Sequence, residues 1–339
     1  MTNEEGKQGQ RMTTIHHGDC IEVMRGMPAD SVDSIVTDPP YGLGFMGKKW
    51  DALPPGEEWA RECLRVLKPG GHLLAFGGTR TWHRLAVAVE DAGFEMRDSI
   101  AWLYGEGFPK HRAALKPAFE PIVMARKPFK GSLIANEAVH GTGALNIDGC
   151  RVGTSKSVPS SASAPQAANP VGIGSVQALS DRPGMDPNTG RRWPANVTLD
   201  ETVAELLDEQ SGNLKHHGMG RGGTNGGTVY GGGLGIHKES RTHGYLDEGG
   251  ASRFFYVAKA PKKERPVVEG TTHPTVKPLN LMRWLVRLVT PSGGIVLDPF
   301  AGSGTTIEAA LREGFRPVGI EREAEYLPLI QARIERSAA

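Results

Sequence analysis

A glycine turn between an apolar run and a helical segment most constrains how this chain folds. Residues 294–297 are apolar and lead into Asp298, and the chain then turns through Gly302 and Gly304. Residues 305–312 have helical spacing, and the next apolar run ends at Glu321, 23 residues after Asp298. Glycines let a backbone approach a ligand closely, and an acid about 20 residues further on can accept hydrogen bonds from ribose hydroxyls. The pattern predicts a parallel α/β sheet with a nucleoside-type cofactor at this turn.

The glycine spacing favours some cofactors over others. Only Gly-x-Gly is present, because Ile307 occupies the position that would continue the series to Gly-x-Gly-x-x-Gly. A dinucleotide such as NAD is therefore disfavoured.

A second turn, Asp38-Pro39-Pro40-Tyr41, follows the apolar run 34–37. The Asp38 carboxylate and the Pro39 carbonyl can each accept one hydrogen of an exocyclic amino group. The prolines fix φ, so that the carbonyl keeps one direction, and Tyr41 offers a ring on which a base can stack. An isolated tetrapeptide of this kind is more often a tight turn after a strand. Beside the cofactor turn, a catalytic role is favoured.

In this order, with a long polar stretch between them, the two turns resemble the amino-group DNA methyltransferases of the permuted β class. The resemblance implies a Rossmann-like S-adenosylmethionine-dependent methyltransferase fold, circularly permuted, with an irregular target-recognition insert. It also implies methylation of adenine N6 or cytosine N4 in double-stranded DNA, by base flipping and direct in-line transfer. Aspartate at the first position of the catalytic turn favours adenine N6, and cytosine N4 is the alternative.

Other functions fit the sequence less well. A protein-glutamine methyltransferase also uses a Pro-Pro-Tyr turn, but there the cofactor motif comes first. A non-catalytic DNA-binding protein on this fold is disfavoured because the residues of both turns are intact. Carbon-5 cytosine methylation uses a cysteine after a proline, whereas Cys20, Cys63 and Cys150 follow Asp, Glu and Gly.

By this resemblance, the cofactor contacts extend beyond the glycine turn. Asp19 would accept a hydrogen bond from the adenine of the cofactor, although it could equally cap the following helix. Thr275 and Lys277 would lie near the methionine carboxylate, although the segment could also be a proline-bounded helix start. The predicted cofactor residues are Asp19, Thr275, Lys277, Asp298, Phe300, Gly302, Gly304, Thr305 and Glu321.

Changes in composition and periodicity along the chain predict four segments. These are a flexible tail at 1–11, a catalytic half at 12–127, a target-recognition insert at 128–251 and a cofactor-binding half at 252–339. Within the insert, residues 211–251 contain 14 glycines among 41 residues, so we expect this stretch to be mobile and to be ordered by a partner. Cations and one aromatic ring in the loops suit contacts to DNA phosphates and base edges. The predicted DNA-contact residues are Lys48, Lys49, Trp50, Arg191, Arg192, Arg221, Lys238, Arg241, Lys262 and Lys263.

Composition adds few further limits. The formal charge is +1, so the net charge by itself does not indicate a polyanionic partner. Three cysteines without a Cys-x-x-Cys pair fit a reducing compartment and argue against disulfides and structural zinc. The loop histidines show no metal-ligand spacing, so no metal site is expected.

No apolar run reaches the ~18–20 residues that span a bilayer, and no signal peptide is evident. We expect a cytoplasmic, nucleoid-associated protein of bacterial or phage origin. The sequence leaves open whether it forms a homodimer or accompanies a cognate restriction enzyme.

Overall fold

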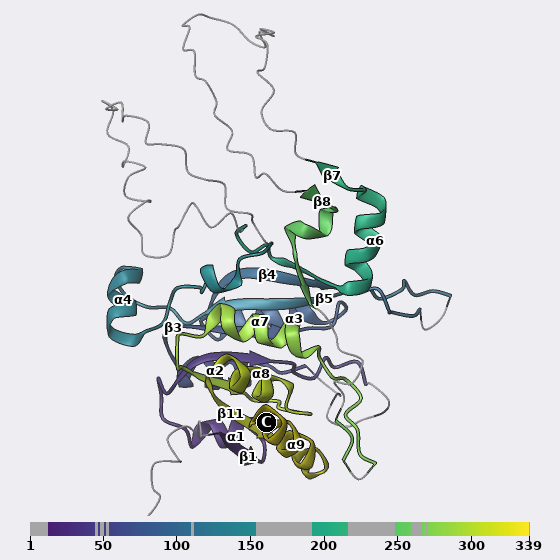
Figure 1. Cartoon of the computed structure of the whole chain (residues 1–339). Helices are drawn as coiled ribbons and strands as arrows, with labels where there is room; N and C mark the ends of the chain where they lie inside the picture. The colour runs from purple at the N-terminus through teal and green to yellow at the C-terminus, as the bar shows by residue number, and fades with distance from the viewer. Residues whose placement is uncertain are drawn as a thin grey trace, which may run out of the picture.

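The computed structural model describes residues 13–44, 47, 51, 54–109, 112–153, 192–215, 248–258, 266–268 and 270–338. In this part of the chain, nine strands form one sheet in the order β1-β11-β10-β2-β3-β5-β4-β6-β9 (Figure 1). Neighbouring strands are parallel except at β5, which is antiparallel to β3 and to β4. The strands are β1 (Thr14–His17), β2 (Val32–Thr37), β3 (Leu67–Phe76), β4 (Glu95–Leu103), β5 (Phe119–Arg126), β6 (Val197–Asp200), β9 (Tyr256–Ala258), β10 (Ile295–Asp298) and β11 (Arg316–Glu321).

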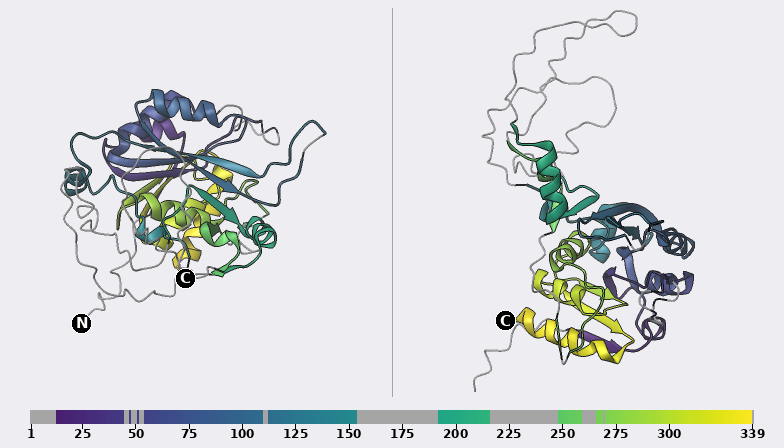
Figure 2. Two further views of the ribbon diagram at one scale, coloured as in Figure 1. Left: turned by 90° about the horizontal axis from the view of Figure 1, so that it is seen from above. Right: turned by 90° about the vertical axis from the view of Figure 1, so that its right-hand side faces the viewer.

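Helices cover both faces of the sheet (Figure 2). Along β3, Leu73 and Ala75 pack with the residues of one face, and Leu74 and Phe76 with those of the other, as the two-residue period of a strand requires. The first face carries α1 (Cys20–Arg25), α2 (Glu57–Val66) and α3 (Trp82–Asp91); the second carries α7 (Leu279–Val289) and α8 (Thr305–Glu313), and α9 (Leu327–Ala338) packs on α8. The predicted α/β class is confirmed.

The two ends of the chain interleave within the sheet. Strand β10 lies between β11 and β2, with Val296 beside Ser34, and β11 pairs with β1, with Gly319 beside Ile15. Because these strands are parallel, their carboxyl ends meet at one edge of the sheet. The turn after β2 and the turn after β10 are therefore neighbours, although more than 250 residues separate them in sequence.

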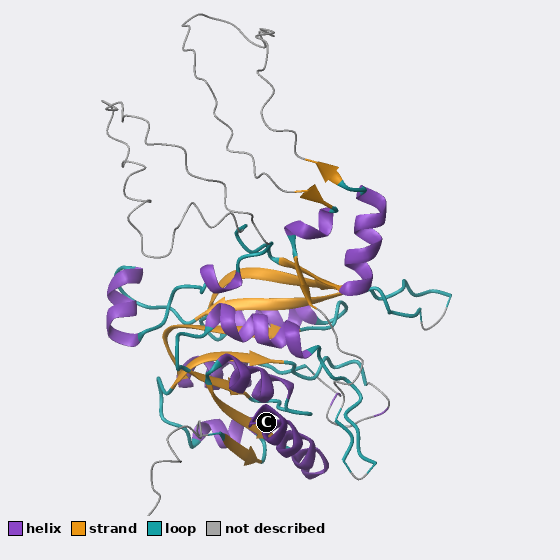
Figure 3. Cartoon of the chain, in the orientation of Figure 1, coloured by secondary structure: helices purple, strands orange, loops and turns teal. Residues whose placement is uncertain are grey.

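The described part of the insert is more regular than the sequence indicated. Strand β6 extends the sheet parallel to β4, and Thr198 and Leu199 within it are almost fully buried. Helix α6 (Glu201–Ser211) packs beside β6, and helix α4 (Leu133–His140) packs against β3. Strand β7 (Leu214–Lys215) pairs with β8 (Glu248–Gly249), as the colouring in Figure 3 shows. The four residues of β6 are too few to give a periodic signal in the sequence. Residues 154–191 and 216–247 lie outside the described residues, and so does most of the glycine-rich stretch.

Local hydrogen bonds mark the boundaries of two elements. A 3₁₀ helix, Ala251–Phe254, precedes β9, and the Arg253 side chain donates to the carbonyls of Gly249 and Gly250. Backbone hydrogen bonds between Lys127 and the glycines at 70 and 71 extend the pairing of β3 toward its start at Leu67.

No helix in the described residues is long and apolar enough to cross a membrane. The same residues contain no cluster of three or more side chains suited to hold a metal ion.

Candidate active site

The turn after β2 holds a compact group of polar side chains. Asp38 Oδ1 lies 2.8 Å from the Tyr41 hydroxyl, and Asp38 Oδ2 lies 2.6 Å from Lys277 Nζ. The Tyr41 hydroxyl is also 3.1 Å from Glu120 Oε2, so its one proton has two carboxylates within reach. Two carboxylates, one ammonium and one phenol thus meet at the carboxyl edge of the sheet. We call Asp38, Tyr41, Glu120 and Lys277 the catalytic cluster.

Lys277 joins this cluster from the far end of the chain. Its ammonium contacts Asp38, the Tyr41 hydroxyl at 3.1 Å and Glu120 Oε2 at 3.2 Å, and its side chain is only 8% exposed. Burial lowers the pKa of this ammonium, but the Asp38 and Glu120 carboxylates raise it more, to about 12. Lys277 is therefore a permanent cation beside the catalytic turn. The sequence prediction had placed it near the methionine carboxylate of the cofactor, and that role stays a prediction.

Glu120 was not among the predicted site residues. It lies in β5, which is otherwise apolar over residues 121–125 and pairs with β3 and β4 in the middle of the sheet. An acid at the start of a strand that runs into the core is a signal that could have been noticed. Its partners could not be inferred, because they come from residues 41 and 277.

Tyr41 is held by both its ring and its backbone. Burial raises the pKa of its hydroxyl well above the usual value, and the nearby Asp38 and Glu120 carboxylates raise it further, so Tyr41 stays a neutral donor. The Thr81 hydroxyl donates to its carbonyl oxygen at 2.7 Å. Its ring packs at the edge of the core that contains Phe76 and α7.

One hydrogen bond joins the catalytic turn to the cofactor turn. The Thr37 hydroxyl, at the end of β2, donates to Asp298 Oδ1 at 2.6 Å, at the end of β10, and the backbone N–H of Phe300 donates to the same oxygen at 3.1 Å. Burial raises the pKa of Asp298 to about 6, although hydrogen bonds from Thr306, Thr37 and the Phe300 backbone act in the opposite direction. Asp298 therefore fixes the start of the glycine turn relative to Asp38.

The glycine turn has the shape of a ligand cradle. Gly302 and Gly304 have φ values of 51° and 80°, and a Cβ added at Gly302 would lie 3.1 Å from the His273 ring. Glu321 accepts the backbone N–H groups of Gly302 at 2.6 Å and Glu323 at 2.7 Å, one on each carboxylate oxygen. Each oxygen of a carboxylate can accept a second hydrogen bond, so Glu321 retains capacity for two ribose hydroxyls. Burial raises the pKa of Glu321, and its backbone hydrogen bonds lower it.

The remaining predicted cofactor residues lie at the same edge or pack behind it. Asp19 follows β1, next to β11, and its carboxylate caps α1 by accepting the N–H groups of Ile21 and Glu22. The Phe300 ring packs against Trp59, with centroids 5.8 Å apart, and the Thr305 side chain is buried against Ser303. Thr275 contacts the His273 ring. These residues fit a nucleoside-type cofactor by position; their cofactor contacts stay predictions.

Most predicted DNA-contact residues lie outside the described residues. Arg192 is described: its guanidinium lies over the Phe254 ring at 4.5 Å and donates to the Arg253 carbonyl at 3.1 Å. The residues outside the described ranges are Lys48, Lys49, Trp50, Arg191, Arg221, Lys238, Arg241, Lys262 and Lys263.

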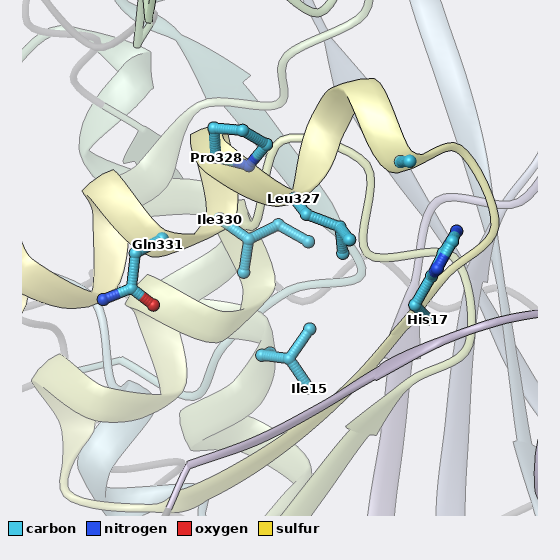
Figure 4. A pocket seen from close by; sticks show the side chains of 7 residues that line it. Ile15, His17, Leu327, Pro328, Ile330 and Gln331 are labelled. Atoms are coloured by element: carbon cyan, nitrogen blue, oxygen red, sulfur yellow. The ribbon is translucent and has the colours of Figure 1, made fainter.

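A pocket opens between β1 and the start of α9 (Figure 4). Ile15, Leu327, Pro328 and Ile330 make most of its wall apolar, and His17 and Gln331 stand at its sides. None of the predicted site residues lines it, although Ile330, in its wall, also packs against Gly304 of the glycine turn.

Comparisons with known proteins agree with this geometry. A family model described as DNA methylase (N6_N4_Mtase) matches residues 32–332. The type II methyltransferase M.HindIII of Haemophilus influenzae is 23% identical, over 91% of this chain and 90% of its own. The DNA adenine methyltransferase YhdJ of Escherichia coli is 24% identical, over 98% of this chain and 86% of its own.

A solved structure, the cytosine-N4-specific PvuII DNA methyltransferase, shares the fold. The two superpose with a TM-score of 0.51 at 14% identity, over 97% of this chain and 92% of the other. The predicted Rossmann-like methyltransferase fold is confirmed. With a family model that spans most of its length, this chain belongs to the N6/N4 DNA methylases, the amino-group DNA methyltransferases that depend on S-adenosyl-L-methionine.

Proposed function

We propose that this protein methylates N6 of adenine in double-stranded DNA, at the turn Asp38–Tyr41. The single observation that carries the proposal is the catalytic cluster, joined to the glycine turn through Thr37 and Asp298. Bound at the glycine turn, S-adenosyl-L-methionine supplies an electrophilic methyl group. Glu321, Gly302 and Asp19 are the residues that would hold it.

The first task of the cluster is to hold the target amino group. The lone pair of an exocyclic amine is delocalised into the ring, and acceptors on both of its hydrogens make that lone pair more available. The Asp38 carboxylate accepts one hydrogen bond from Tyr41 and one from Lys277. An ionised carboxylate has about four acceptor positions, so Asp38 can accept a further hydrogen bond from the amino group. The Pro39 carbonyl would accept the second hydrogen.

Lys277 and Glu120 would set the charge of the site. The ammonium pairs with the Asp38 carboxylate and stabilises its negative charge. Glu120 balances that ammonium and also accepts from Tyr41, which orients the phenol ring. Preset charges of this kind lower a barrier without reorganisation during the reaction.

The second task is to remove a proton. As the new carbon–nitrogen bond forms, the methyl carbon–sulfur bond of the sulfonium would break and leave a neutral thioether. The amino nitrogen becomes cationic and strongly acidic, and it must release one hydrogen as a proton to give a neutral methylamine. The Asp38 carboxylate already accepts that hydrogen and is the nearest group to take the proton. No covalent bond between enzyme and base is needed, and the three cysteines are free and buried.

The choice of adenine rests on the aspartate of the catalytic turn and on the likeness to an adenine methyltransferase, YhdJ. Cytosine N4 is the second candidate, because PvuII methyltransferase shares the fold and is cytosine-N4-specific. In a duplex either base must leave the stack to reach the cluster, at a cost of a few kcal/mol. The predicted cations of the insert would contact the phosphates and base edges around it.

The direct test is product analysis. Purified protein is incubated with plasmid DNA and S-adenosyl-L-methionine carrying an isotopic methyl label, and the DNA is digested to nucleosides. We expect the label in N6-methyldeoxyadenosine. Label in N4-methyldeoxycytidine would reject the adenine target and keep the mechanism, and label in neither nucleoside would reject the proposal.

A further inference from the structure

Three successive backbone amides at the base of the catalytic turn point at one carboxylate. Asp51 Oδ1 accepts from the N–H of Tyr41 at 2.6 Å and of Gly42 at 2.9 Å, and its Oδ2 accepts from Leu43 at 3.2 Å. The Asp51 carbonyl also accepts from Gly44 at 2.9 Å. Asp51 is only 2% exposed, so these bonds form away from bulk water.

Successive N–H groups that converge in this way form a concave anion site. Gly42 makes the convergence possible, because its φ of 67° lies in the left-handed region that other residues rarely adopt. Such sites commonly take an external phosphate or sulfate. Here Asp51, a few residues further along the chain, fills it with its own carboxylate, and hydrogen bonds to an ionised acceptor are stronger than neutral ones.

The consequence falls on Tyr41, which is fixed from several sides. Asp51 holds its N–H, Thr81 holds its carbonyl, and Asp38 with Glu120 holds its hydroxyl. Its ring lies close to Gly78, where an added Cβ would come within 3.1 Å of Tyr41 Cδ2. Rotation of the peptide before Tyr41 would therefore move both the ring and the carbonyls of the proline pair. Asp51 is the side chain that restrains this peptide.

We propose that Asp51 is a positioning residue for methyl transfer: by collecting the amides of residues 41–43, it holds the Tyr41 ring and the proline carbonyls where the target base is received. The proposal rests on the proposed function of the catalytic turn. Asp51 does not contact Glu321 or the glycine turn in the contacts above, so cofactor binding should not depend on it.

The first test is Asp51→Asn. Asparagine keeps the size and one acceptor oxygen, but its amide nitrogen cannot accept from Leu43 and its charge is lost. We expect kcat to fall ~10–100-fold, with the Kd for S-adenosyl-L-methionine unchanged within a factor of two. A kcat within threefold of wild type would overturn the proposal.

A matched control separates positioning from general stability. Asp33 lies near the start of β2, at the end of the strand away from the catalytic turn, and is also a buried carboxylate. It accepts the backbone N–H of Ile295 and pairs with Lys68. Asp33→Asn should lower the Tm at least as much as Asp51→Asn and leave kcat within threefold of wild type. An equal loss of kcat in both variants would show that Asp51 contributes to stability and does not position the catalytic turn.

A double-mutant cycle shows whether Asp51 acts through Tyr41. In a Tyr41→Ala background, Asp51→Asn should lower kcat by a smaller factor than in the wild type, since the ring is gone and only the proline carbonyls remain to be positioned. Full additivity of the two effects would contradict the proposal.

Hydrogen exchange at the amides of residues 41–43 gives a readout that needs no catalysis. These amides should be protected in the wild type and lose that protection in Asp51→Asn but not in Asp33→Asn. Unchanged protection would overturn the proposal. If the wild type transfers no methyl group, the proposed function fails, and this exchange measurement still decides whether Asp51 holds the turn.

Discussion

Lys277 Nζ lies 2.6 Å from Asp38 Oδ2, although 239 residues separate the two in the chain. The contact joins the segment before α7 to the turn after β2, across the insert. It also adds a second contact to a lysine that the sequence predicts near the cofactor, because Lys277 pairs with the catalytic carboxylate. The first prediction concerns this pair.

Replacing Lys277 by methionine should destabilise the protein and impair transfer. The change leaves Asp38 and Glu120 side by side without their cation, and removing one partner of a buried ion pair typically costs about 3–5 kcal/mol. The double variant Lys277→Met, Glu120→Gln has one carboxylate fewer and should recover part of that loss in urea unfolding. A double variant less stable than Lys277→Met alone would show that Glu120 does not balance Lys277.

Asp38→Ala should abolish methyl transfer while cofactor binding remains. Asp38 holds the target amine in our account and does not belong to the glycine turn, so we expect kcat to fall by ~100-fold or more. Calorimetric titration with S-adenosyl-L-methionine gives the control. Loss of cofactor binding by a folded Asp38→Ala protein would assign Asp38 a different role.

Glu321→Ala should weaken cofactor binding by about 1.5–3 kcal/mol, the usual value of a hydrogen bond to a charged acceptor. The reason is the loss of a carboxylate that supports Gly302 and would accept the ribose hydroxyls. Glu323→Gln is the matched control, because Glu323 is two residues further on and pairs with the exposed Arg322. If the wild type and Glu321→Ala bind S-adenosyl-L-methionine with equal affinity, Glu321 does not bind the ribose hydroxyls.

Asp298 predicts a pH dependence of stability. Burial raises its pKa from an ordinary value of 3.8 to about 6. Between these pH values the folded protein keeps a proton that the unfolded chain has released, so this group makes the free energy of unfolding fall as pH rises from about 4 to 6. The shift corresponds to on the order of 3 kcal/mol.

The variant Asp298→Asn keeps an acceptor oxygen for Thr37 and Phe300 but has no such titration. Urea unfolding at several pH values should therefore show Asp298→Asn gaining stability relative to wild type across that window, with no further gain above it. Parallel pH profiles for the two proteins would show that Asp298 titrates normally.

The sequence was sufficient for the fold class and the two turns, because strand-turn-helix periodicity and the residues of each turn are local signals. Glycine at 302 and 304 was predictive for the same reason: their φ values require it. Local signals also placed α8 to within one residue, since the segment predicted at 305–312 is the helix Thr305–Glu313.

What the sequence could not give depends on contacts between distant segments. The roles of Glu120 and Lys277 depend on the fold, because it brings β5 and the segment before α7 next to the turn after β2. Nothing in the sequence distinguishes Asp51 from the other acidic residues, whereas in the structure it accepts hydrogen bonds from three successive amides. Strand β6 escaped notice because its register with β4, rather than its own four residues, makes it a strand.

Methylation-sensitive single-molecule sequencing of DNA from cells that express the protein tests the central claim most directly. Cells with the wild-type protein should carry N6-methyladenine at one recurring sequence motif, and cells with Asp38→Ala at the same expression level should carry none there. Methylated adenine at the same motif in the Asp38→Ala cells, or no methylated amino group in either, would contradict the account.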